Sequence, residues 1–112
     1  MTVYGAQQQI TQAVSQWPDV TVAPHRFGGV EYQLGTRELG HIHGDSLVDI
    51  PFPTAVRKAL VASGEVQPHH VLPDSGWISF YIREPDDVNH AIKLLQQSYE
   101  IAQKQAAHRR PL

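Results

Sequence analysis

The sequence contains no cysteine, no long apolar run and no excess of basic residues, and each absence excludes a class of protein. Without cysteine the chain can form no disulfide, thiolate nucleophile or cysteine-ligated metal site. No apolar segment approaches the roughly 20 residues of a membrane-spanning helix, and the N-terminus lacks a signal-peptide pattern. The net charge of -2 disfavours nucleic acid as a partner. We therefore expect a cytoplasmic protein that binds neither a membrane nor a nucleic acid.

What the chain does contain fits one folded domain that is rich in histidine. At 112 residues it can build one modest core but not two, so we expect a single domain over residues 1–112. Its 41% hydrophobic and 18% charged residues are ordinary for a globular protein and argue against disorder. Seven histidines are many for this length, and two pairs are close in sequence, at 41 and 43 and at 69 and 70.

Hydrophobic periodicity and turn residues predict an α+β fold with the element order α-β-β-β-β-α-β-α. The predicted helices cover residues 4–16, 54–62 and 85–102, and the predicted strands cover residues 20–23, 30–34, 37–43, 47–50 and 77–82. Because tight turns join neighbouring strands, we expect an antiparallel sheet of about five strands with the helices packed on one face. Residues 25–29 are a predicted turn, and the polar residues 103–112 are a predicted frayed tail.

The clearest local signal is a hairpin formed by residues 30–34 and 37–43. The two residues between these strands begin with Gly35, which is typical of a type II′ turn. An uninterrupted register from this turn places Tyr32 opposite Leu39. The same counting places residue 30 opposite residue 41.

This register predicts which face of the hairpin carries the histidines. Since side chains alternate along a strand, one face would hold Val30, Tyr32, Leu34, Arg37, Leu39, His41 and His43. That face is the apolar one, so we expect both histidines to point towards the core. Polar groups on an inward face need partners, and a ligand pocket is one way to supply them.

The His-x-His spacing also permits a metal site. Two imidazoles on one face of a strand lie about 6 to 7 Å apart, which is near enough to share one ion. A catalytic metal site needs a third protein ligand, and the spacing does not choose among Asp45, Asp49, His69 and His70. Three interpretations stay open: a metal site, a metal-free polar pocket, and two structural histidines. We expect that no metal binds. If one does, its ligands should be His41 and His43.

Arg37 and Asp49 are candidate ligand-binding residues. Arg37 could fork onto a carboxylate or enolate of a ligand, or it could extend to water. Because Arg37 and Glu38 alternate, only one of them can face the site. Asp49 could orient an imidazole through its free N–H, or it could bond to a backbone amide.

The loop before the last strand supplies further candidates. His69 and His70 are adjacent in an extended segment and should point to opposite sides, so we expect His69 alone to face the pocket. We include His70 and Trp77 among the candidate ligand-binding residues, although an aromatic residue in this strand is also typical of a core.

Several segments together resemble the luciferase-domain family of small uncharacterised proteins, which is related to the fungal luciferases. The matching segments are Pro-His-Arg-Phe-Gly-Gly-Val-Glu-Tyr at 24–32, Arg-Glu-Leu-Gly-His-Ile-His-Gly at 37–44, Asp-Ile-Pro-Phe-Pro at 49–53, His-His-Val-Leu-Pro-Asp-Ser-Gly-Trp at 69–77, and the helix at 87–99. The resemblance covers about residues 17–102. It implies a shared fold and a shared position for the pocket.

Fungal luciferases oxidise a hispidin-type luciferin with dioxygen. The resemblance therefore implies acid/base roles for His41, His43 and His69 on a small acidic or phenolic ligand, with cofactor-independent oxygenation as the reaction. It requires no cofactor, while the histidines remain compatible with a divalent metal. It does not imply light emission, because the fungal enzymes differ around residues 49–53 and 73–77 and have a membrane-associated N-terminal part.

The same residues also fit a protein without catalytic activity. A module that holds a small molecule, or a divalent metal, needs the same polar face as an enzyme does. The sequence is therefore consistent with an enzyme or with a non-catalytic binding module, and the expected partner in either case is a small-molecule ligand.

Overall fold

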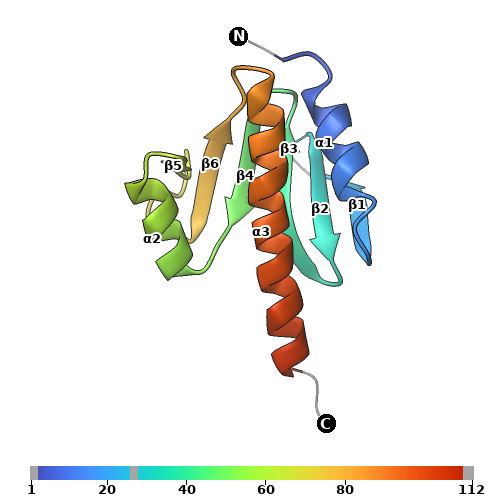
Figure 1. Cartoon of the computed structure of the whole chain (residues 1–112), viewed down its shortest axis with the longest axis vertical. Helices are drawn as coiled ribbons and strands as arrows, with labels where there is room; N and C mark the ends of the chain where they lie inside the picture. The colour runs from blue at the N-terminus through green and yellow to red at the C-terminus, as the bar shows by residue number, and fades with distance from the viewer. Residues whose placement is uncertain (1–2, 26–27, 110–112) are drawn as a thin grey trace.

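The structure, a computed structural model, describes residues 3–25 and 28–109 and combines a sheet with helices (Figure 1). Its elements in chain order are α1 (Ala6–Val14), β1 (Val20–Pro24), β2 (Val30–Leu34), β3 (Arg37–His43), β4 (Leu47–Pro51), α2 (Thr54–Ala62), β5 (Gln67–Pro68), β6 (Trp77–Tyr81) and α3 (Asp86–Arg109). The strands form one antiparallel sheet in the order β1-β2-β3-β4-β6-β5. The predicted α+β class and element order are confirmed.

The structure adds detail at β5 and at the end of α3. β5 pairs Gln67 with Ser79, so the sheet has six strands where about five were predicted. A two-residue strand is too short to leave an alternating pattern in the sequence. α3 continues to Arg109, beyond the end of its apolar stripe, because residues 103–107 are Gln, Lys and Ala, which are good helix formers. Residues 26–27 of the predicted turn and 110–112 of the predicted tail lie outside the described residues.

Helices α1 and α3 cover one face of the sheet (Figure 1). α3 runs across the middle of the sheet and contacts β3 and β4, while α1 packs beside it and α2 contacts β6. The core between these layers includes Ile10, Val14, Ile42, Val48, Ile50, Ala91 and Leu95, all fully buried. Burying a large aliphatic side chain is worth about 1.5–3 kcal/mol. The free energy that holds the sheet therefore comes mainly from its helix side.

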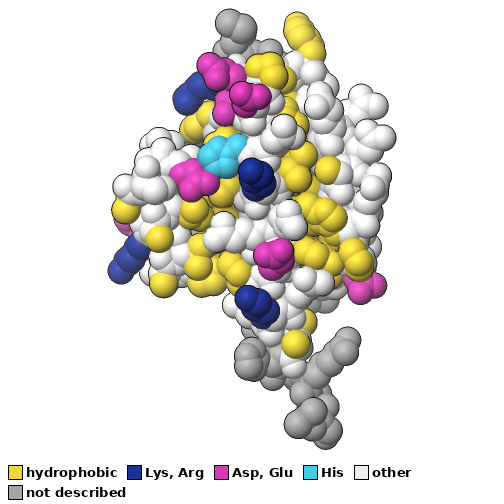
Figure 2. All heavy atoms as spheres, viewed as in Figure 1, with side chains coloured by type: hydrophobic (Ala, Val, Ile, Leu, Met, Phe, Trp, Pro, Cys, Tyr) yellow, Lys and Arg dark blue, Asp and Glu magenta, His cyan; other side chains and the backbone are white. Residues whose placement is uncertain are grey.

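The outer surface of the helix-covered face is mixed in character. Figure 2 shows Lys and Arg side chains interspersed with Asp and Glu over α3 and its surroundings, rather than gathered into one basic area. Within the described part of the chain, no helix is both long enough and apolar enough to cross a membrane.

A β-bulge changes the register of the hairpin. The turn itself is as predicted, because Gly35 has φ +64° and the residues on either side of the turn, 34 and 37, are paired. After Gln33 pairs with residue 38, however, Tyr32 pairs with Gly40 and not with Leu39. β3 therefore contains one extra residue, and every later side chain of β3 faces the opposite way from the prediction.

The expectation that His41 and His43 point into the core is consequently wrong. A Cβ built on Gly40 would meet Leu95 of α3, so Gly40 and the alternate residue Ile42 face the helices. His41 and His43 occupy the other face of the sheet, away from α3. The sequence does contain one signal of this bulge, since Gly40 lies inside the strand and a glycine there often marks a bulge or a close backbone approach.

Gly40 should tolerate no side chain. An added Cβ would lie 2.8 Å from Leu95 Cδ2 and 3.0 Å from the carbonyl oxygen of Asp49, so Gly40→Ala should lower the free energy of unfolding by about 1–3 kcal/mol in urea denaturation. Gly64→Asn is the control, since its Cβ meets nothing within 4 Å and Asn is accepted in the left-handed position that follows a helix. Equal stability of the two variants would contradict this packing.

Candidate functional site

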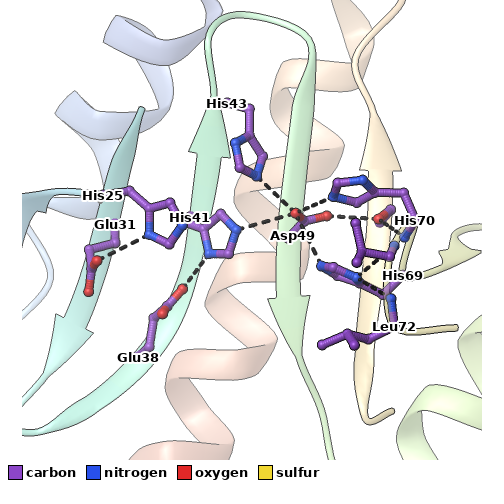
Figure 3. A network of polar contacts seen from close by, with 11 residues as sticks. His25, Glu31, Glu38, His41, His43, Asp49, His69, His70 and Leu72 are labelled. Carbon is purple, nitrogen blue, oxygen red and sulfur yellow. Dashed lines mark hydrogen bonds and ion pairs between the residues drawn. The ribbon is translucent and has the colours of Figure 1, made fainter. Parts of the chain in front are cut away.

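The carboxylate of Asp49 is the centre of the polar face. Asp49 lies on β4, is paired with His41 of β3 and Ser79 of β6, and is fully buried. Its Oδ1 accepts a hydrogen bond from Ser79 Oγ at 2.7 Å. Its Oδ2 lies close to four imidazole Nε2 atoms, at 3.2 Å (His41), 3.0 Å (His43), 3.4 Å (His69) and 3.0 Å (His70) (Figure 3).

These contacts keep Asp49 ionised despite its burial. Burial by itself would raise the pKa of the carboxyl group, because it disfavours the charged form. Hydrogen bonds from His41, Ser79 and His70 outweigh that effect and hold the pKa of Asp49 well below its usual range. The middle of the sheet therefore carries a fixed negative charge.

His41 lies between two carboxylates. Its Nδ1 is 2.6 Å from Glu38 Oε2, and its Nε2 faces Asp49. Burial of the ring lowers the pKa of His41, but the hydrogen bonds to Asp49 and Glu38 outweigh burial and raise the pKa to about 9. In the metal-free protein His41 is therefore a cation at neutral pH. The ring of His25 stacks on it, with centroids 4.0 Å apart, and His25 in turn bonds to Glu31.

His69 is fixed in one tautomer by the loop that carries it. Its Nδ1 accepts the backbone N–H groups of Val71 at 3.1 Å and Leu72 at 2.9 Å. The ring proton of the neutral imidazole must then be on Nε2, the atom that faces Asp49. Burial is the main cause that lowers the pKa of His69 below its ordinary value, which keeps the ring neutral. His69 is therefore a hydrogen-bond donor.

The tight turn at His69 also brings the next residue to the site. The backbone N–H of His70 bonds to Ser79 Oγ at 3.2 Å, and its Nε2 lies 3.0 Å from Asp49. The expectation that only one of these neighbouring histidines faces the pocket is wrong, because the segment turns after residue 68 and does not continue as an extended strand. Arg57 of α2 donates to the carbonyl of Pro73 and so ties the rest of the loop to the body of the protein.

A pocket of about 380 Å³ opens above this cluster. The histidines and Asp49 form its polar side, and Val71, Leu72 and Trp77 form an apolar side. Val71 and Leu72 are 67% and 54% exposed, so apolar surface surrounds the entrance. The volume is within the range of sites that hold small organic molecules.

The structure brings most of the predicted site residues together. The pocket is lined by His41, His43, Asp49, His69, His70 and Trp77, all of which were candidates. Arg37 is not among the lining residues and Glu38 is, because the bulge follows Glu38 and leaves it on the same side as His41. Asp45 lies elsewhere and accepts the backbone N–H groups of Gly5 and Gln7 at the start of α1.

Sequence reasoning missed Glu38 and His25 as parts of the site. Glu38 was set aside because Arg37 was placed on the inner face, and only knowledge of the bulge reverses that choice. His25 lies at the end of β1, across β2 from the cluster, so its contact with His41 depends on strand order rather than on a local pattern.

The polar face also contains groups that could hold a metal ion. They are His41–His43–Asp49, Asp49–His69–His70 and His25–Glu38–His41, and in each group the potential ligand atoms lie within 4.8 Å of one another. Imidazole and carboxylate groups are common ligands of divalent transition metals.

The raised pKa of His41 predicts a pH dependence of stability in the metal-free protein. Since the folded-state pKa of about 9 exceeds the ordinary 6.5, protonated His41 stabilises the folded state fully below about pH 6.5. This contribution is lost as the pH rises through about 9, so the free energy of unfolding should fall by up to about 3 kcal/mol. Urea denaturation in the presence of a chelator measures it.

The matched variants are His41→Gln and His90→Gln. His41→Gln should remove most of the dependence between pH 6.5 and 9.5, whereas His90→Gln, which alters a partly exposed histidine bonded to Glu65, should retain it. A slope that persists in His41→Gln would show that another group is responsible.

Comparison with known proteins gives a family for this chain. A model of the luciferase domain matches residues 36–98, which span β3, β4, the pocket loop, β6 and about half of α3. No curated protein and no solved structure matches the chain significantly. Because the matched segment covers more than half of the sequence and includes most of the residues around Asp49, the chain belongs to the luciferase-domain family.

Proposed function

We propose that the protein binds a small acidic or phenolic molecule in the Asp49 pocket and acts on it by histidine acid/base chemistry, with oxygenation by dioxygen as the reaction. One observation carries this proposal: a polar cluster of imidazoles and the apolar side chains of Val71, Leu72 and Trp77 line the same open pocket. The polar side can receive an anionic oxygen, and the apolar side can receive a ring. Family membership supports the same kind of ligand.

The two sides of the pocket favour an aromatic anion for separate reasons. Trp77 and Leu72 offer apolar contact area, so a planar ring gains free energy by leaving water there. The partly exposed imidazoles of His43 and His70 can each donate a ring N–H group to a phenolate or carboxylate oxygen. A neutral aliphatic molecule would gain only the first contribution.

The histidines would have different roles in the reaction. His43 is the candidate base, since its side chain is 30% exposed and is therefore accessible to a ligand. It would take the proton of a phenol or enol, and the resulting enolate would supply the electrons that react with dioxygen. His41 would hold the carboxylates of Glu38 and Asp49 in place, because its ring nitrogens face both of them, and the partly exposed His70 would donate a hydrogen bond to the anion. His69 would hold the carboxylate of Asp49 in place, because both of its ring nitrogens are already engaged.

Binding can be tested with 4-hydroxycinnamate as the probe, monitored through tryptophan indole N–H signals in NMR. Trp77 lines the pocket and should shift, whereas Trp17 packs against Tyr99 and should not. His43→Ala should weaken binding by about tenfold or more through loss of a hydrogen bond to a charged group. His90→Ala is the matched control and should bind like the unaltered protein. Equal binding by both variants would contradict the proposed site.

Turnover distinguishes an enzyme from a binding module. With phenolic pyrones as substrates, dioxygen consumption should depend on His41 and His43, and each alanine variant should lose at least about 100-fold in rate while remaining folded by circular dichroism. Pyrone that binds but is recovered unchanged, with no dioxygen consumed, would instead favour a non-catalytic small-molecule-binding module.

A further inference from the structure

We infer that Asp49, His41 and His43 form a site for one divalent transition-metal ion, with His69 as a hydrogen-bond donor and not a ligand. This deepens the proposed function, because the ion would lie beneath the ligand in the same pocket. In the metal-bound protein the ion, and not a base at His43 or a cation at His41, would favour the anionic form of the ligand. The inference stands on the geometry of the ring nitrogens and on where their protons must be.

The first step concerns Oδ2 of Asp49, which has more imidazole nitrogens around it than it can bond. A carboxylate offers about four lone-pair positions, two on each oxygen. Oδ2 of Asp49 has four imidazole nitrogens within 3.4 Å, and Oδ1 is already bonded to Ser79. Hydrogen bonds to Oδ2 can satisfy about two of these nitrogens, so the remaining pair would lie unsatisfied around a buried charge.

The second step assigns His69 to one of those two positions. Because its Nδ1 accepts two backbone N–H groups, its Nε2 carries a proton and has no lone pair for a metal. Three nitrogens, those of His41, His43 and His70, then compete for one remaining lone pair of Oδ2. A cation that binds the lone pairs of His41 and His43 directly reduces this conflict, and His70, which is 34% exposed, can bond to water.

The third step concerns His41 and Glu38. The Glu38 carboxylate accepts the Nδ1–H of His41 at 2.6 Å, which directs the lone pair of a neutral ring on Nε2 towards Asp49. A ligating histidine whose other nitrogen donates to a carboxylate is a recurrent arrangement in metal sites. Glu38 would therefore orient a ligand without touching the ion.

The distances agree with this ligand set. A tetrahedral ion with bonds of about 2.0–2.1 Å keeps its ligand atoms about 3.3–3.4 Å apart. The Nε2 atoms of His41 and His43 lie 3.2 and 3.0 Å from Oδ2, and the three potential ligand atoms lie within 4.8 Å of one another. His43 and His70 are 30% and 34% exposed at the pocket, so an ion can enter from solvent.

The experiment is a titration of chelator-treated protein with Zn²⁺ by calorimetry and with Co²⁺ by visible absorption. We expect one equivalent of either ion, and a Co²⁺ spectrum of four or five coordination. His43→Ala should weaken Zn²⁺ binding by at least about 100-fold, and Glu38→Gln by about 10- to 100-fold. His69→Ala should stay within about tenfold of the unaltered protein.

Two controls make the titration decisive. His90→Ala removes the exposed histidine bonded to Glu65 and should change nothing, so a loss there would indicate binding at that surface pair and overturn the inference. His25→Ala tests the alternative group with Glu38, and loss in this variant together with retention in His43→Ala would place the ion there instead and also overturn it. Circular dichroism verifies that each variant is folded.

The outcome is separable from the proposed function. If metal-free protein binds 4-hydroxycinnamate but takes up no Zn²⁺ or Co²⁺, the metal site is wrong and the ligand pocket stands. If one equivalent of metal binds with the expected variant pattern but the probe does not, the metal site stands and the proposed ligand class is wrong.

Discussion

The buried charge of Asp49 is the constraint on which the polar face of the sheet depends. An unpaired carboxylate in a protein interior costs several kcal/mol, so its position is stable only while hydrogen-bond donors surround it. Here the donors come from Ser79 on one side and from histidines of β3 and of the pocket loop on the other. The carboxylate of Asp49 thus holds together segments that are far apart in sequence.

The two faces of the sheet have different roles: one packs against the helices, and the other carries the candidate site. The helix side is filled by aliphatic side chains from α1, α3 and the alternate positions of the strands, and it provides most of the burial. The opposite side can then hold a cluster of ionisable groups that would be unfavourable in an apolar core. One hydrogen bond links the two faces. The side-chain hydroxyl of Ser98 on α3 donates to the carbonyl of Leu39, two residues before His41.

Local patterns in the sequence predicted the helices and strands well. They predicted less well which face of the sheet each side chain occupies. Turn chemistry at Gly35 and apolar periodicity depend on nearby residues, so the hairpin and the helices could be recognised. The site residues could be grouped because His-x-His and His-His are conspicuous in a short chain. The bulge is indicated locally only by Gly40 inside the strand. The inclusion of Glu38 and the stacking of His25 depend on strand pairing and packing, which no short stretch of sequence records.

The extra residue in β3 has a consequence for how relatives of this chain should be compared. His41 and His43 lie on the pocket side only because β3 contains one extra residue between the turn and His41. A homologue that keeps both histidines but lacks one residue in this interval would direct them at α3, where Leu95 already fills the space next to Gly40. The motif is therefore defined by its distance from the turn as well as by its histidines, and an alignment gap there would indicate loss of the site.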